Sequence, residues 1–189
     1  MQITRTTRRL ASAVAIAGLA IGAPAVALAA SGGSQAAPAT SFVRCHTGQL
    51  TDWIGLPADA TAGSNYYELE ISNTSRQTCG LYGFPGVSAL RGGHQVGSPA
   101  ARNAYLPQRV VSLSPGATAH FILQITDVEN FSAGACHPVT ADALKIYAPG
   151  AYSAHEVPFS FAACSKSGPV YLHVSTTVKG TGIPGYSTS

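Results

Sequence analysis

Apolar residues in this chain recur at every second position, and this period limits the folds that the chain can adopt. In residues 66–72 (YYELEIS), the apolar Tyr67, Leu69 and Ile71 alternate with polar side chains. The same alternation runs through residues 118–125 (TAHFILQI). Successive side chains of a β-strand point to opposite faces, so the pattern predicts strands with one buried and one solvent-facing side.

Turn-forming residues separate many short segments of this kind. RGGH at residues 91–94 predicts a hairpin, and FPGV at residues 84–87 predicts a type II turn centred on Pro85 and Gly86. Further strands are expected at residues 50–54, 79–82, 87–90, 95–96, 110–113, 143–147, 157–161 and 170–178. Pro158 predicts that its own strand lies at a sheet edge. Because a short helical turn is expected only around residues 139–143, the chain predicts an all-β fold, an immunoglobulin-like β-sandwich of about eight short strands.

The first 29 residues have the pattern of a secretory signal peptide. Arg5, Arg8 and Arg9 precede an apolar run at residues 10–28, and ALA at residues 27–29 forms an A-x-A cleavage site. A membrane anchor is the competing interpretation, since the run approaches the length that spans a bilayer. We expect cleavage and a secreted, extracellular or cell-wall-associated protein without a membrane span in the mature chain. Export through the Sec or the twin-arginine route stays open.

The remaining chain divides by composition into three parts. Residues 30–41 (ASGGSQAAPATS) predict a flexible linker, residues 42–178 a single folded domain, and residues 179–189 a disordered tail. The formal charge of +3 arises from the three arginines of the first segment, because eight basic and eight acidic residues follow residue 30. A nucleic-acid-binding domain should carry a basic face, so this balance argues against nucleic acid as a partner.

Four cysteines predict two disulfide bonds. Cys45, Cys79, Cys136 and Cys164 are an even number in a chain expected to leave the reducing cytoplasm, and three pairings are possible. We expect Cys45–Cys79 and Cys136–Cys164, because each pair closes one local loop and the loops do not cross. Each loop would contribute about 3.5 kcal/mol in the chain-entropy model. The cysteine spacing offers neither a zinc motif nor an odd thiol for catalysis.

The order of motifs along the chain resembles one known family. Cys45 is followed by NTS at residues 73–75, TCGLYGFPGV at 78–87, VSLSPG at 111–116 and two further cysteines. This series is similar to the actinobacterial family called domain of unknown function 4232 (DUF4232) over about residues 45–174, and residues 73–87 are its most specific part. The resemblance implies a secreted or surface-associated β-sandwich of a high-GC Gram-positive bacterium. It implies no activity, because the family has no assigned function.

Six histidines raise the question of a metal site. They are His46, His94, His120, His137, His155 and His173. A blue-copper site needs a free cysteine and usually a methionine, and Met1 is the only methionine of the chain. His120 and His173 share the polar phase of their strands and could be neighbours in a weak two-histidine site. We expect isolated surface histidines, no metal and no cofactor.

Two carboxylates and the serines are the candidates for catalysis. Glu68 and Glu70 lie on one strand face about 7 Å apart, a separation that could suit a glycosidase pair. The simpler interpretation is that both residues lie on the solvent-exposed face of a strand. The sequence contains no G-x-S-x-G motif of a serine hydrolase. We therefore expect no catalytic residues and no enzyme.

Aromatic residues are the remaining candidates for a binding surface. Tyr66, Tyr147 and Tyr171 fall on the strand phase opposite their buried neighbours, and Tyr82 and Phe84 lie in the family-specific segment. Exposed tyrosines provide contact area at low entropic cost. We expect a monomeric, secreted, non-enzymatic binding or interaction module whose partner is a protein or a cell-wall glycan. The alternatives are an extracellular hydrolase whose site forms only in three dimensions, and a weak metal carrier.

Overall fold

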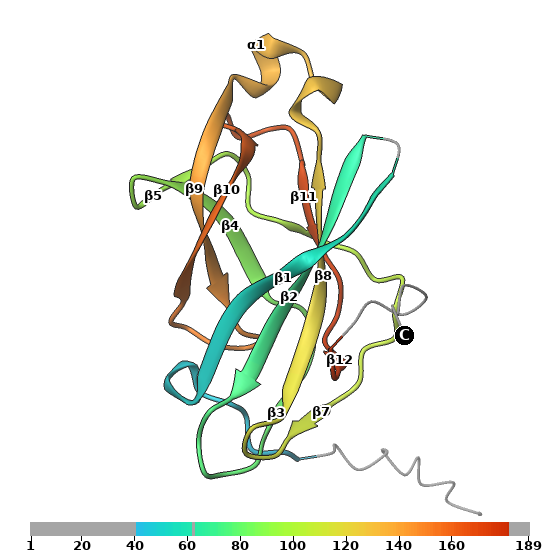
Figure 1. Cartoon of the computed structure of the whole chain (residues 1–189), viewed down its shortest axis with the longest axis vertical. Helices are drawn as coiled ribbons and strands as arrows, with labels where there is room; N and C mark the ends of the chain where they lie inside the picture. Colours follow the sequence, from blue (N-terminus) through green and yellow to red (C-terminus); the bar gives the residue numbers. More distant parts are fainter. Residues whose placement is uncertain (1–40, 62, 182–189) are drawn as a thin grey trace, which may run out of the picture. The chain divides into compact units, whose positions relative to one another are not determined.

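A computed structural model describes residues 41–61 and 63–181, and β-strands dominate this part of the chain (Figure 1). One sheet has the order β1-β2-β8-β11-β6, with β12 also paired to β8. Its strands are β1 (Leu50–Thr61), β2 (Ser64–Asn73), β8 (Thr118–Thr126), β11 (Leu172–Val174), β6 (Ala101–Arg102) and β12 (Val178–Lys179). The all-β prediction is confirmed, whereas the immunoglobulin-like connectivity stays a prediction.

A second and a third sheet complete the described fold. The second has the order β10-β9-β4-β5, and the third pairs β3 with β7. These strands are β10 (His155–Cys164), β9 (Pro138–Tyr147), β4 (Gly86–Arg91), β5 (His94–Val96), β3 (Cys79–Leu81) and β7 (Val111–Leu113). Helical structure in the described part is limited to the short turns η1 (Thr47–Gln49), η2 (Val128–Asn130) and α1 (Ala133–Cys136).

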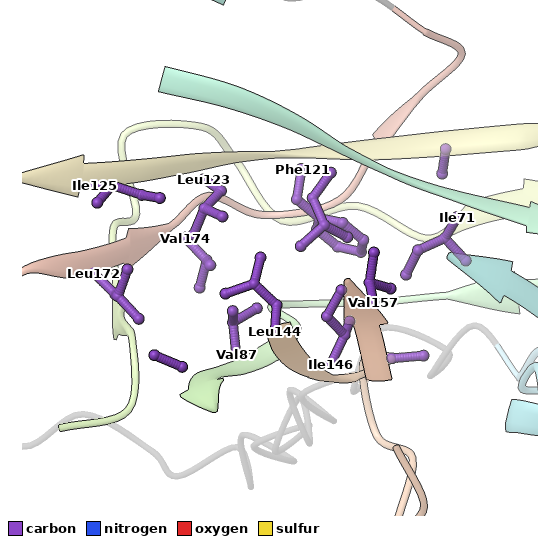
Figure 2. Packing of buried hydrophobic residues seen from close by; sticks show 14 of the residues in the cluster. Ile71, Val87, Phe121, Leu123, Ile125, Leu144, Ile146, Val157, Leu172 and Val174 are labelled. Atoms are coloured by element: carbon purple, nitrogen blue, oxygen red, sulfur yellow. The ribbon is translucent and has the colours of Figure 1, made fainter. Parts of the chain in front are cut away.

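The core lies between the first and second sheets. Figure 2 shows Phe121 and Leu123 of β8 on one side of the core and Leu144 and Ile146 of β9 on the other. All four side chains are fully buried. Burying a side chain of this size stabilises a fold by about 1.5–3 kcal/mol, so the contact between the two sheets is the main hydrophobic contribution to stability.

The ladder between β2 and β8 sets which residues enter this core. Nine residue pairs run without a break from Ser64↔Thr126 to Ser72↔Thr118. Leu69 pairs with Phe121, and both point into the core. Because strand side chains alternate, the residues between the buried ones lie on the opposite, outer face of the sheet.

Three details of the predicted secondary structure are wrong. Residues 139–143 form part of β9 rather than a helical turn, because residues 139–141 and 143 pair with β10. Gly86 begins β4 in extended conformation, and the positive φ of 101° falls on Gly83 instead, so no type II turn is centred on Pro85 and Gly86. Residues 170–178 divide into β11 and β12, which pair with different parts of β8.

The edge prediction for Pro158 is confirmed. Its strand, β10, stands at the end of the second sheet and pairs with β9 alone in the described part. The register shifts between Pro158 and Phe161. Because proline lacks a backbone N–H, an edge strand with an irregularity is the position where it does least harm to the ladder.

Both predicted disulfides are confirmed. Cys45 is bonded to Cys79, 34 residues apart, and Cys136 to Cys164, 28 residues apart. The first ties the segment before η1 to β3, and the second ties the end of α1 to the end of β10. Two disulfides are compatible with an extracellular protein.

The folded region extends past the predicted boundary at residue 178. Lys179 belongs to β12, and the Gly180 N–H donates to the Thr118 carbonyl at 2.9 Å, so the start of the expected tail is part of the sheet. The expected signal peptide (1–29) lies outside the described residues, as do the expected linker (30–41) apart from Ser41 and the tail beyond Thr181. Among the described residues, no helix is long and apolar enough to cross a membrane.

We expect each disulfide to be separately important for stability. Replacing both cysteines of one pair by alanine should lower the free energy of unfolding by about 3.5 kcal/mol, because the unfolded chain regains the freedom of one loop. Denaturant unfolding of the two paired variants measures this. Non-reducing peptide mapping of the native protein should recover the linked peptides of Cys45–Cys79 and Cys136–Cys164, and crossed links would contradict the structure.

Gly97 is a position where only glycine fits. Its φ is +67°, and a Cβ there would collide with the Cys164 carbonyl oxygen and approach Tyr171 Cε1 to 3.0 Å. Gly97→Ala should therefore lower the free energy of unfolding by about 3 kcal/mol. Gly93→Ala is the matched control, because Gly93 also has a positive φ but has no atom within 4 Å of the position that a Cβ would occupy. It should cost about 1 kcal/mol, and equal losses would refute steric crowding at Gly97.

Candidate functional site

The outer face of the six-stranded sheet gathers aromatic, acidic and amide side chains in neighbouring rows. In one row Trp53 of β1 pairs with Glu70 of β2, and Glu70 pairs with His120 of β8. In another, Tyr66 of β2 pairs with Gln124 of β8. Together with the nearby Tyr105 and Glu68, these side chains form the outer-face site, which consists of Trp53, Tyr66, Glu68, Glu70, Tyr105 and Gln124.

The Trp53–Glu70 pair is the best-fixed part of this site. The Trp53 side chain is 36% exposed and lies beside the Glu70 carboxylate, whose pKa it lowers. Gly55 lies beneath that carboxylate, since a Cβ at Gly55 would stand 3.2 Å from Glu70 Oε1. Burial raises the pKa of Glu70 above its ordinary value of 4.5, and the neighbouring Glu68 raises it further, against smaller opposing effects of His120 and Trp53. The negative charge of Glu68 thus disfavours ionisation of Glu70.

His120 lies beside the carboxylates but is buried. Its Nδ1 is 2.6 Å from the Gly180 carbonyl oxygen, to which it donates, and 3.6 Å from Glu68 Oε1. Its Nε2 is buried without a hydrogen-bond partner. The strand β12 pairs with β8 at this position and covers the ring, so His120 is not the surface residue that its polar strand phase predicted.

His173 does not lie beside His120, although the two histidines share the polar phase of their strands. His173 pairs with Gln124, four positions along β8 from His120, which separates the two by about 13 Å. Burial lowers the pKa of His173, whose Nδ1 has no partner. No group of three or more metal-ligating side chains occurs among the residues that the structure describes.

Tyr66 and Tyr105 form the other end of the outer-face site. Tyr105, 53% exposed, hydrogen-bonds Ser175. Burial raises the pKa of Tyr105, Ser175 lowers it in part, and the nearby Tyr66 raises it again. Gln124 Nε2 donates to Ser64 Oγ at 3.1 Å, which fixes the amide between the strands.

The remaining predicted surface residues lie elsewhere. Tyr82 is 42% exposed after β3, and Phe84 is partly buried with the Arg102 guanidinium 5.8 Å from its ring centre. Tyr147 lies on the second sheet, where Lys145 Nζ is 5.5 Å from its ring centre. The sequence-predicted residues therefore occupy separate surfaces rather than one.

Tyr171 does not belong to any surface. Its ring is fully buried against Gly97, and its hydroxyl is 3.5 Å from the Val96 carbonyl oxygen. Burial raises the pKa of Tyr171 to about 12. Strand alternation predicted that Tyr171 is exposed, because alternation does not reveal that the loop after β5 covers the outer side of this segment.

Sequence reasoning did not single out three members of the outer-face site, which are Trp53, Tyr105 and Gln124. Trp53 could have been found, because it alternates with the buried Leu50 and the partly buried Ile54 and so falls on the outer phase of its strand. Tyr105 lies in the connection between β6 and β7, where no periodicity indicates its direction.

An Asp–His pair lies at the edge of the sandwich. Asp52 Oδ2 of β1 is 3.0 Å from His155 Nδ1 of β10, and the Asp52 side chain is 2% exposed. Burial raises the pKa of Asp52, against a hydrogen bond and an electrostatic attraction from His155. The pair thus joins β1 of the first sheet to β10 of the second.

Comparison with known proteins places these residues in a family. A family model described as domain of unknown function (DUF4232) matches residues 45–179. The chain belongs to this family. The matched DUF4232 domain contains both disulfides and every strand that contributes to the outer-face site. No curated protein and no solved structure matches the chain.

The raised pKa of Glu70 gives a test of the site by stability. The pKa of Glu70 in the folded protein lies above the ordinary value of 4.5. The folded state is therefore stabilised by the protonated form of Glu70 at pH values below 4.5, and this stabilisation is lost as the pH rises through the pKa of the folded protein. Glu70→Gln keeps an acceptor for Trp53 and removes the charge, so it should be more stable than the native protein near neutral pH and equally stable below pH 4.5.

Denaturant unfolding across this pH range measures the difference. Glu156→Gln, which removes an exposed carboxylate from β10, is the control and should change stability little at any pH. The same pH dependence in both variants would show that net charge, and not the environment of Glu70, causes the effect.

Proposed function

We propose that this DUF4232 domain is a secreted, non-enzymatic binding module that acts at the cell envelope or in the medium, and that its ligand contacts the outer-face site. The observation that carries the proposal is the gathering of Trp53, Tyr66 and Tyr105 beside Glu68, Glu70 and Gln124 on one sheet face. The signal-peptide pattern and the two disulfides support an extracellular setting.

A cell-wall glycan is the ligand class that this chemistry favours. Aromatic rings offer flat apolar faces to the C–H side of a sugar, while their polar tips stay available for hydrogen bonds. Carboxylate oxygens accept hydrogen bonds from sugar hydroxyls, and an amide both donates and accepts. A few polar groups among aromatic contacts are typical of small-ligand sites.

The scaffold supports a preformed site. Tyr66, Glu68 and Glu70 come from one strand of the unbroken β2–β8 ladder, so their spacing is fixed by the sheet. Trp53 pairs with Glu70 across the ladder between β1 and β2, which fixes its backbone beside that carboxylate. A site on a rigid sheet loses little conformational freedom when a ligand binds, which favours affinity.

The alternative proposal is a glycoside hydrolase that uses the same face. The raised pKa of Glu70 beside the second carboxylate of Glu68 favours it, since glycosidases pair a protonated with an ionised carboxyl group. The absence of a catalytic sequence motif favours the binding module.

Trp53 provides a direct assay for the outer-face site, because it is the only tryptophan of the chain. Titration with soluble polysaccharide prepared from Gram-positive cell walls should shift or quench its emission. Tyr66→Ala and Tyr105→Ala should each weaken binding about tenfold, equivalent to losing about 1.4 kcal/mol of ring contact.

Tyr152→Ala is the matched control, because Tyr152 is fully exposed and lies in the loop between β9 and β10. It should bind like the native protein. Unchanged Trp53 emission with every cell-wall fraction would refute the glycan proposal. Release of reducing ends that is lost in Glu70→Gln would establish the hydrolase instead.

A further inference from the structure

A groove away from the outer-face site runs between the end of the β6–β7 connection and β12. Its volume is about 450 Å³. Figure 1 shows the lime-green connection into β7 descending beside the red β12. The apolar part of its lining is formed by Leu106, Pro107, Val110, Val111 and Val178. Grooves of this size are large enough for a few side chains of a peptide.

Hydrogen bonds hold both walls of the groove in place. Thr177 donates to the Gly83 carbonyl oxygen through both its N–H and its Oγ1, each at 3.0 Å. Thr176 Oγ1 donates to the Leu106 carbonyl oxygen at 3.5 Å. Both threonines are buried, so the groove is built into the fold rather than opened by a ligand.

Two cations flank this apolar floor. Arg109 and Lys179 line the groove, and both are exposed. The ion pairs described in the structure join His120 to Glu68 and His155 to Asp52, and neither involves Arg109 or Lys179. No acidic residue lines the groove. The charge pattern therefore complements a ligand that combines apolar groups with carboxylates.

The strand along one wall has an unused edge. β7 pairs only with β3 in the part of the chain that the structure describes. Its residues Val111 and Ser112 also line the groove. An extended peptide can add to such an edge through backbone hydrogen bonds and place alternate side chains into an adjacent pocket. An acyl chain would use the apolar floor but not this edge.

We propose that this groove binds an extended acidic segment of another protein. The segment adds along β7, places an apolar side chain on Val110 and Val178, and directs its carboxylates to Arg109 and Lys179. This interaction is separate from ligand binding at the outer-face site and does not depend on it. A domain with both surfaces would link a protein partner to a second ligand.

The peptide acetyl-DVELDVE-amide is the probe for this proposal. It should bind the native protein in isothermal titration calorimetry, and its affinity should fall as NaCl concentration rises. In NMR spectra, the amide signals of Val111, Ser112 and Lys179 should shift. The basic peptide acetyl-KVKLKVK-amide and the non-apolar peptide acetyl-DGEGDGE-amide should bind at least tenfold more weakly. Trp53 emission should not change, which separates this groove from the outer-face site.

Charge reversal locates the contact. Arg109→Glu and Lys179→Glu should each weaken binding of the acidic peptide about tenfold, because attraction becomes repulsion. Arg91→Glu, at the exposed β4–β5 hairpin of the other sheet, is the matched control and should change affinity less than twofold. Thermal unfolding of all three variants shows that each is folded.

Several outcomes would overturn the proposal. They are no binding of the acidic peptide up to millimolar concentration, equal weakening by Arg91→Glu, or a response of Trp53 emission to the peptide. Binding of sub-micellar decanoate in the groove, without any shift of the β7 amides by the peptide, would assign the groove to an anionic lipid and also overturn it.

Discussion

The antiparallel ladder between β2 and β8 is the contact on which the rest of the domain depends. Its unbroken register sends Leu69 and Phe121 into the core and leaves Glu70 on the outer face. Because the side-chain period of a strand is two, a slip by one residue would exchange these faces. The same register therefore determines both the stability of the sandwich and the composition of the outer-face site, and neither can change without the other.

Sequence reasoning succeeded for several features with a local signal, although the local FPGV signal at residues 84–87 predicted a turn that the structure does not form. The alternation of residues 66–72 and 118–125 predicted β2 and β8, and the RGGH segment predicted the β4–β5 hairpin. The disulfide pairing followed from loop length and from an even cysteine count. Tyr66, Glu68 and Glu70 were recognised as outward-facing for the same reason, since only the phase of one strand was needed.

Contacts between distant segments account for what the sequence could not predict. His120 has a polar strand phase, but β12, about 60 residues later in the chain, covers its ring. Tyr171 is buried because Gly97, more than 70 residues earlier, leaves space for its ring. Residues 139–143 became a strand because partners on β10 satisfied their backbone groups. Each of these partners lies far along the sequence from the residue that it contacts. Strand alternation alone therefore predicted the wrong burial or secondary structure for that residue.

The charged residues of the described domain have a consequence for handling it. The ion pairs described there join His120 to Glu68 and His155 to Asp52, and both involve a histidine. Packing, backbone pairing and two covalent links thus hold the domain together, and none of these is screened by dissolved ions. Concentrated salt would therefore elute molecules that are bound to the immobilised domain through charge interactions, while the domain stays folded. Natural binding partners that the domain retains at low ionic strength can then be eluted with salt and identified.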